Sequence, residues 1–380
     1  MDIGGSVRFY PVSYIDATAS NLSGTRESVK LTSEHLLLHE IREQPTTILE
    51  TLEAEKTRIP QAARFLGRRT IHFLGMGSSY CSCLYAKYLL EELAQRRSEA
   101  HLASEFLHYP PSLTPNDVFV AISQSGESIE TVKAVEMLRR KHAHTRILAI
   151  TNDPESKLAK LSDITLLTHA GVEKVSATKT FTSTIALLYV LAATIAQRSG
   201  KISERKLSHP WNNLTQSAKN LKDNFGTWEE RTNSFAERFA SCRSLMIVGR
   251  GPNVVAALQG ALIFKEVAKV PTEGMSGGEF THGPMEALSS EIGVVVLGGG
   301  RTRELQIKLA QRAKALGACV LMLTPQRTEG VDSIEFVESD ESLMVFPCNV
   351  ILNLLTYFTA VKRGLDTDRF TVISKVTRVE

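Results

Sequence analysis

Short apolar runs with the composition of buried strands alternate with helix-like segments along most of the chain. The expected strands are residues 71–76, 118–123, 146–151, 164–168, 244–249, 292–298 and 318–323. Strands that are apolar throughout and separated by helices are typical of a parallel sheet covered on both faces. The alternation therefore predicts an α/β fold built from doubly wound, flavodoxin-like parallel sheets.

The two halves of the sequence are related by a constant offset of 174 residues. This offset separates Gly75 from Gly249, which begin similar Gly-x-Gly segments, and it also separates Glu92 from Glu266. An ungapped repeat of this size predicts two tandem domains of the same fold. The expected division is an N-terminal extension with helices (1–62), a first domain (63–200), a helical connector (201–235), a second domain (236–365) and a C-terminal tail (366–380).

The composition excludes several classes of protein. The 380 residues carry a formal net charge of +3 and lack the dense basic stripe that is typical of nucleic-acid-binding proteins. The most apolar helical run, residues 185–196, is too short to cross a bilayer, so we expect a buried helix and no membrane partner. Residues 1–11 lack a secretory signal, and five irregularly spaced cysteines fit a reducing compartment, which predicts a cytoplasmic protein.

Small hydroxyl side chains gather where two predicted strands of the first half end. These candidate anion-binding residues are Ser78, Ser79, Ser123, Gln124, Ser125 and Ser128. Ligands of open α/β sheets bind beyond the carboxyl ends of the strands, where N–H groups at helix starts favour an anion. Helix capping by the same serines is the alternative, but two serine-rich strand ends in one half favour a phosphate site.

Two kinds of nucleotide site are not expected at these strand ends. The segments that begin at Gly75 and Gly249 lack the third glycine of the dinucleotide fingerprint, and a Gly-Lys-Ser/Thr motif is absent. The corresponding segment of the second half, residues 298–304 (GGGRTRE), has lost most of the hydroxyls. The sequence therefore places the anion site in the first half.

Glu266 and His282 are the candidates for acid–base chemistry in the second half. Glu266 lies on an otherwise apolar helix face, where burial raises a carboxyl pKa toward neutrality, and His282 lies in a loop bounded by Gly and Pro. Taken alone, each residue is more often structural. His35 and His39 have the spacing of metal ligands, but Leu36 replaces the glutamate of the zinc motif, so we predict no metal and no cofactor.

Five motifs occur in the same order as in a known family. They are SQSGES (123–128), VSATKTFTS (175–183), the Lys265-Glu266 pair, GEFTHGP (278–284) and DTDRFTVISKVTRVE (366–380). From about Glu40 onward the chain resembles the sugar isomerase (SIS) domain pair of the glutamine–fructose-6-phosphate amidotransferases. The resemblance implies two tandem SIS domains that bind a phosphosugar and form a homodimer with active sites shared across the interface.

The resemblance also implies roles for individual residues. Residues that match the family's substrate-binding positions are Ser79, Ser123, Gln124, Ser125, Ser128, Val175 and Ala177. Glu266 matches the base that moves a proton between C1 and C2 of the open-chain sugar. His282 matches a ring-opening residue donated by the neighbouring subunit, and Lys375 matches a lysine that forms a Schiff base with the ketose carbonyl.

Departures from the family pattern bear on the expected reaction. Residue 2 is Asp2 rather than a cysteine nucleophile, and the glutaminase domain has no counterpart, so no glutaminase activity is expected. Ile263 and Thr281 each stand where the family has a lysine, and the family's tail proline is replaced near Phe370.

The expected reaction is the conversion of glucosamine 6-phosphate to fructose 6-phosphate and ammonia. Deglycation of a sugar–amino-acid phosphate is one alternative, and plain isomerisation of a sugar phosphate is another. A sulfonate could replace the phosphate, because hydroxyl and N–H donors discriminate poorly between such anions. A non-catalytic phosphosugar sensor is the alternative of another class, although it would not need Glu266, His282 and Lys375 together.

Overall fold

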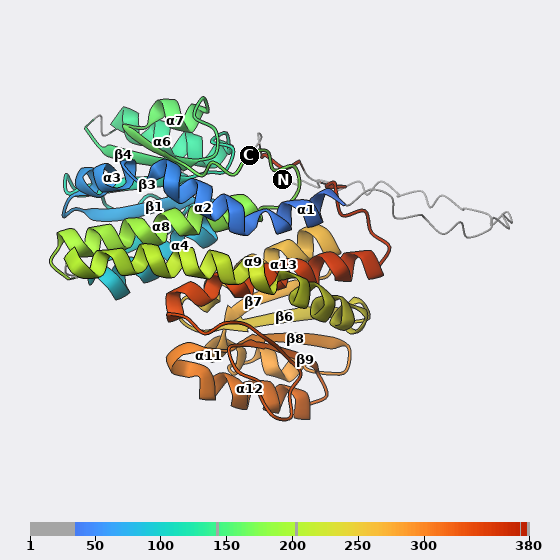
Figure 1. Ribbon diagram of the computed structural model, residues 1–380. Coiled ribbons are helices and arrows are strands. Elements are labelled where there is room, and N and C mark those ends of the chain that lie inside the picture. Colours follow the sequence, from blue (N-terminus) through green and yellow to red (C-terminus); the bar gives the residue numbers. More distant parts are fainter. Residues whose placement is uncertain (1–34, 142–143, 202–203, 373, 378–380) are drawn as a thin grey trace, which may run out of the picture. The chain divides into compact units, whose positions relative to one another are not determined.

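The chain contains two sheets of five parallel strands (Figure 1). The computed structural model describes residues 35–141, 144–201, 204–372 and 374–377, so residues 1–34 of the expected N-terminal extension (1–62) lie outside the described residues. The first sheet has the order β2-β1-β3-β4-β5, and the second has the order β10-β9-β8-β6-β7. Each half therefore repeats the flavodoxin-like order 2-1-3-4-5, which confirms the predicted fold class.

The strands agree with the sequence prediction wherever they are apolar. The strands are β1 (Thr70–Gly75), β2 (Ser98–Leu102), β3 (Asp117–Ile122), β4 (Arg146–Thr151), β5 (Ile164–Leu167), β6 (Ser244–Gly249), β7 (Thr272–Ser276), β8 (Ile292–Leu297), β9 (Cys319–Thr324) and β10 (Ser333–Glu335). The edge strands β2, β7 and β10 were not expected, because their side chains are largely polar. All neighbouring strands are parallel.

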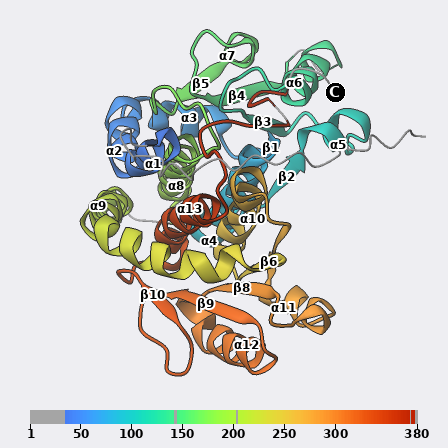
Figure 2. The same ribbon diagram turned by 90° about the vertical axis from the view of Figure 1, so that its right-hand side faces the viewer.

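Helices pack on both faces of each sheet. They are α1 (Leu36–Arg42), α2 (Gln44–Glu55), α3 (Arg58–Leu66), α4 (Ser78–Ala94), α5 (Ala103–His108), α6 (Ile129–Lys141), α7 (Lys157–Leu161), α8 (Lys179–Arg198), α9 (Glu204–Ala240), α10 (Asn253–Ile263), α11 (Gly277–Phe280), α12 (Arg303–Ala315) and α13 (Val345–Lys362). Figures 1 and 2 show α4, α8, α9 and α13 between the two sheets. The largest apolar core fills this middle layer and joins both halves.

Helix α8 is the clearest example of a core helix. It is 20 residues long, so its length alone does not exclude a membrane span, contrary to what the shorter run at 185–196 indicated. However, 94% of the most apolar 18-residue stretch of this helix is buried inside the protein. The corresponding stretch within a second apolar segment, Glu341–Lys362, is 89% buried. Packing between the two sheets therefore accounts for the apolar composition of both segments.

The backbone repeats the 174-residue offset seen in the sequence. The strands β1 and β6 keep this offset at both ends. Two pairs of glycines with positive φ keep it as well, namely Gly77 (52°) with Gly251 (55°), and Gly126 (65°) with Gly300 (60°). Residues with a side chain rarely adopt such angles, so glycine is favoured at all four positions. The same two turns therefore occur in both halves.

Candidate active site

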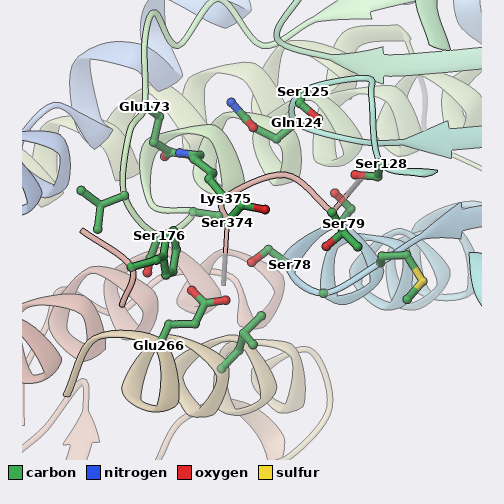
Figure 3. Close-up of a pocket in the computed structure, with 17 residues that line it drawn as sticks. Ser78, Ser79, Gln124, Ser125, Ser128, Glu173, Ser176, Glu266, Ser374 and Lys375 are labelled. Carbon is green, nitrogen blue, oxygen red and sulfur yellow. The ribbon is translucent and has the colours of Figure 1, made fainter. Parts of the chain in front are cut away.

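One cavity lies at the carboxyl ends of β1 and β3, where the strand order of the first sheet reverses (Figure 3). Crevices at such switch points are the usual ligand sites of open α/β sheets. The cavity has a volume of about 200 Å³. It is lined by Met76, Gly77, Ser78, Ser79, Gln124, Ser125, Ser128, Glu173, Val175, Ser176, Ala177, Leu262, Glu266, Phe370, Ser374, Lys375 and Thr377.

The tight turn between β3 and α6 presents hydroxyl groups to this cavity. Gly126 has a positive φ, and an added Cβ would collide with Ser156, so only glycine fits between β3 and α6. The Ser125 hydroxyl accepts a hydrogen bond from the N–H of Glu127 at 3.2 Å, which leaves its own proton free for a ligand. The cavity side of the turn therefore offers hydroxyl donors without any cation from the same loop.

Ser123 belongs to the same turn but does not line the cavity. It is 1% exposed, and its Oγ lies 3.0 Å from the Oγ of Ser128 and accepts the N–H of Gly126 at 3.1 Å. Ser123 therefore holds the turn from behind, and Ser128 faces the cavity. Ser123 was predicted to contact the ligand directly, but its buried position favours an indirect role.

Glu266 reaches the cavity from the second half of the chain. It lies in a single π-helical turn (Phe264–Ala268) that ends α10, and such turns are frequent at functional sites. Figure 3 shows its carboxylate on the side of the cavity opposite Gln124 and Ser125. Burial is the main cause that raises the pKa of Glu266, while the neighbouring Ser176 hydroxyl and the more distant Lys269 and Lys375 charges oppose the rise.

Lys375 enters the cavity from the C-terminal tail and contacts a buried carboxylate. Its Nζ lies 3.1 Å from Oε2 of Glu173, whose side chain is fully buried. Glu173 also accepts hydrogen bonds from the N–H groups of Thr178 and Thr180 at the start of α8, at 2.9 and 3.1 Å. These contacts satisfy the buried charge of Glu173 and give the lysine a fixed partner.

The tail is attached on both sides of Lys375. The Asp368 carboxylate accepts the N–H groups of Leu36 and Leu37 at 2.9 and 3.1 Å, at the start of α1. Beyond the lysine, the carbonyl of Thr377 accepts the N–H of Ile129 at 3.2 Å, at the start of α6. The lysine is therefore held over the cavity by contacts with two helix N-termini.

Glu40 supports the loop that carries Glu173 and Val175. Its carboxylate, from α1, accepts the N–H of Lys174 at 2.6 Å and that of Val175 at 3.4 Å. Burial is the main cause that raises its pKa, and the N–H of Lys174 opposes this. On the other side of the loop, Gln259 of α10 donates to the carbonyl of Ala177 at 3.1 Å. The loop is thus shaped by side chains from two distant helices.

Nine of the predicted site residues border the cavity together. They are Ser78, Ser79, Gln124, Ser125, Ser128, Val175, Ala177, Glu266 and Lys375. His282 does not border it, and is exposed in the turn after α11. Glu173 and Ser176 were not singled out from the sequence, although both lie beside Val175, and Glu40 was named only as the start of the resemblance.

The arrangement combines three chemical capacities. Hydroxyl and N–H groups at one end can hold an oxyanion. A buried carboxyl with a raised pKa at the other end can exchange protons with carbon. A lysine between them, held by the Glu173 carboxylate, can react with a carbonyl once it is unprotonated.

Comparison with known proteins agrees with this fold. The sequence matches the SIS domain family over residues 65–194 and 238–333. It is 33% identical to the glutamine–fructose-6-phosphate aminotransferase (isomerizing) of Nostoc sp. (strain PCC 9229) over 377 residues, which cover 93% of this chain and 60% of the relative. It is 35% identical to the enzyme of the same name from Gloeobacter violaceus over 363 residues, which cover 91% of this chain and 59% of the relative. The chain spans about 60% of the length of such relatives.

Solved structures have the same architecture. The C-terminal domain of glucosamine-fructose-6-phosphate aminotransferase from Francisella tularensis superimposes with a TM-score of 0.83 at 25% identity, covering 90% of this chain and 100% of that one. The glucosamine-6-phosphate deaminase of Thermotoga maritima shares the fold with a TM-score of 0.71 at 23% identity, covering 90% and 98% of the two chains. With two matching segments, two parallel sheets and relatives of this kind, the chain belongs to the SIS domain family.

Proposed function

We propose that the chain is an enzyme that converts a phosphosugar between its aldose and ketose forms. One observation carries this proposal: the hydroxyl-lined turns of the first half and Glu266 of the second half border the same cavity. If the phosphate of a sugar is bound at Gln124 and Ser125, the rest of the sugar extends toward Glu266 (Figure 3). That placement suits a substrate whose charged group lies at the opposite end from its reacting carbons.

Proton transfer between C1 and C2 is the central step. The Glu266 carboxylate takes the proton from C2 of the open-chain aldose, and the electron pair of the C2–H bond forms the C1=C2 double bond of an enolamine or enediol while the C1 oxygen takes up a proton. Glu266 then returns its proton to C1, and the hydroxyl or amine on C2 loses one as its double bond to C2 forms. A carboxyl whose pKa is raised by burial is a stronger base than an exposed one, and its conjugate acid stays protonated to a higher pH.

Glucosamine 6-phosphate is the favoured substrate. After the proton shift its C2 carries an imine, and the unprotonated Lys375 attacks C2 and releases ammonia. Water then hydrolyses the lysine imine, so the sum is glucosamine 6-phosphate and water giving fructose 6-phosphate and ammonia. The Lys375–Glu173 contact of 3.1 Å supports this role of the lysine, because it holds the amine beside the cavity.

Two further substrate classes fit the same cavity. A sugar–amino-acid phosphate would follow the same steps with an amino acid as the leaving amine. A neutral sugar phosphate, or the corresponding sulfonate, would need only the proton transfer at Glu266. A non-catalytic phosphosugar sensor is less consistent with a buried carboxyl of raised pKa that faces a lysine across the cavity.

The remaining predicted group, His282, fits a shared site. It is exposed and lies outside the cavity of its own chain, so we propose that it opens the sugar ring in the cavity of a second copy. The proposed enzyme is therefore a homodimer. Mixing Glu266→Gln and His282→Gln chains tests this: each is inactive alone, and mixed dimers regain activity because one of their two sites is intact.

The reaction is tested with a panel of sugar phosphates. The purified chain is incubated with glucosamine 6-phosphate, a fructose–amino-acid phosphate, glucose 6-phosphate and the matching sulfonate, and both ammonia and ketose are measured. Ammonia and fructose 6-phosphate in equal amounts, lost in Lys375→Ala, are expected. Ketose from a neutral sugar phosphate, together with no ammonia from glucosamine 6-phosphate, would overturn the deamination. Binding without turnover of any member of the panel would favour the sensor.

A further inference from the structure

A cluster of two histidines and a glutamate lies on the first sheet, away from the cavity. His72 on β1 pairs in register with Glu99 on the edge strand β2, and Leu74 pairs with His101. Side chains two positions apart on a strand share a face, so His72, Glu99 and His101 lie on the same face of the sheet. None of the three lines the cavity of the candidate active site.

The donor atoms of the three side chains converge. His72 Nδ1 lies 3.0 Å from His101 Nε2, and His101 Nε2 lies 3.7 Å from Glu99 Oε2. All three residues can place one ligand atom within 4.8 Å of the others. Bonds of about 2.0–2.1 Å to a four-coordinate ion put neighbouring ligand atoms roughly 3 to 3.5 Å apart, close to the distances seen here.

A carboxylate behind the cluster orients one of the rings. The second nitrogen of His72, Nε2, lies 3.4 Å from Asp117 Oδ1. The other oxygen of Asp117 accepts the N–H and hydroxyl of Thr114, which fixes the carboxylate in place. A carboxylate on the outer nitrogen of a histidine is the usual support of a metal ligand, because it places the lone pair on the inner nitrogen.

The surroundings leave the cluster rigid on one side and open on the other. His72 is 4% exposed and packs against the ring of Phe119, with ring centroids 5.1 Å apart. His101 packs against Phe106 of α5 at 5.3 Å, whereas the Glu99 side chain is 37% exposed. An ion could enter from the Glu99 side and keep a water as its fourth ligand.

We propose that His72 Nδ1, His101 Nε2 and a Glu99 oxygen form a binding site for a divalent transition-metal ion, with Zn²⁺ as the best match. Two imidazoles and one carboxylate are a donor set that suits zinc and its neighbours better than magnesium or calcium. The nearly parallel rings, 11° apart, share a hydrogen bond when no ion is present. The ion takes the place of that proton, which moves to the other nitrogen of His101, and it ties the edge strand β2 to β1.

The test uses the full chain, without an affinity tag and stripped of metal with a chelator. Zn²⁺ is titrated in competition with a chromogenic chelator, and Co²⁺ is added separately to record its absorption. We expect one Zn²⁺ per chain and the intense visible bands of four-coordinate Co²⁺. His101→Gln and Glu99→Gln, both at the exposed edge strand, should bind Zn²⁺ at least 100-fold more weakly.

Two further variants separate this site from unspecific binding. Asp117→Asn keeps all three ligands and should lower the affinity about tenfold, because it weakens the support of His72. His108→Gln removes an exposed histidine of α5 in the same half and should change nothing. Equal Zn²⁺ affinity in the wild type and folded His101→Gln, checked by circular dichroism, would overturn the proposal, as would the absence of stoichiometric binding.

Discussion

The two halves of this protein have the same backbone turns but different contents at the switch point of each sheet. In the first half, the turns at Gly77 and Gly126 border an open cavity lined by hydroxyls. In the second half, the corresponding turns at Gly251 and Gly300 lie against the side chain of Glu341. The same strand order therefore produces one open site and one filled site.

The second switch point is filled by a carboxylate of the chain itself. Glu341 begins the short 3₁₀ helix Glu341–Met344, and its Oε2 pairs with Nε of Arg301 at 2.7 Å. Arg301 also reaches Glu92 of α4 in the first half, at 2.6 Å. The Glu341 carboxylate therefore lies beside the glycine turn of the second half, in the place where the first half has an open anion site. The duplicated fold thus fixes where an anion can lie, whereas the side chains decide which anion it is.

The largest expected effect separates Glu266 from its repeat partner Glu92. In Glu266→Gln the proton acceptor is lost while the volume is kept, so kcat should fall by about 10²- to 10⁴-fold. Glu92 occupies the equivalent position in the first half, but its side chain is 51% exposed and pairs only with Arg301 among the contacts described. Glu92→Gln should therefore change kcat less than about twofold.

The measurement is steady-state kinetics on the substrate that the panel identifies. Binding of that substrate to Glu266→Gln, followed by calorimetry, should stay near the wild-type value, since the charged end of the sugar is held elsewhere. Equal losses of turnover in the two variants would mean that the catalytic assignment to the second half is wrong.

The next prediction removes hydroxyl groups from one half at a time. Ser125→Ala and Ser128→Ala each delete a donor to a charged group, and such hydrogen bonds contribute about 1.5–3 kcal/mol, or roughly ten- to hundredfold in affinity. KM should rise accordingly, with a smaller change in kcat. Thr302→Ala, which changes the residue equivalent to Ser128, should leave both constants unchanged. A rise in KM for Thr302→Ala would show that the second switch point also takes part in binding.

A smaller effect is expected from the carboxylate that shapes the loop at 173–177. Glu40→Gln keeps one acceptor but turns an amide nitrogen toward a backbone N–H of Lys174 or Val175. The loop should loosen, and KM should rise several-fold with little change in kcat, as expected of a residue that positions others. Glu55→Gln is the matched control, because Glu55 is equally buried but contacts His169, at 2.9 Å, rather than the loop at 173–177. A fall in kcat alone would contradict the positioning role.

The sequence predicted the fold well because the central strands are continuous apolar runs. It missed β2, β7 and β10, which lie at sheet edges and carry polar side chains such as Glu99, His101 and Glu273. The cluster of His72, Glu99 and His101 could not be predicted for the same reason, because two of its three members lie on a strand without an apolar signature. Edge strands therefore limit what periodicity can show.

The candidate site was predictable where its residues directly follow strands. The turns after β1 and β3 were visible as hydroxyl-rich segments, because the carboxyl ends of parallel strands meet at one edge. Glu173 was not visible, since its contact with Lys375 joins residues 202 positions apart and depends on how the tail folds back. Likewise, only the structure shows that Glu341 fills the second switch point.

The smallest expected effect concerns stability and follows from the burial of Glu266. Burial raises its pKa in the folded protein above that of the unfolded chain, so the ionised carboxylate costs stability once it forms. The contribution of Glu266 is thus most favourable below the unfolded pKa of about 4.3 and is lost as the pH rises through the folded value. Glutamine cannot ionise and avoids this loss.

Urea unfolding of the wild type and Glu266→Gln at about pH 5 and about pH 8 tests this sign. The variant should be more stable than the wild type at the higher pH, and the difference should shrink on acidification, because the wild-type carboxyl then becomes protonated. Glu92→Gln, exposed at the equivalent position, should show no such trend. A variant that is less stable at both pH values would mean that the hydrogen bond with the Ser176 hydroxyl and the attraction of the Lys269 charge outweigh the cost of burial. In that case the Glu266 carboxylate would stabilise the second half rather than act as a catalytic base.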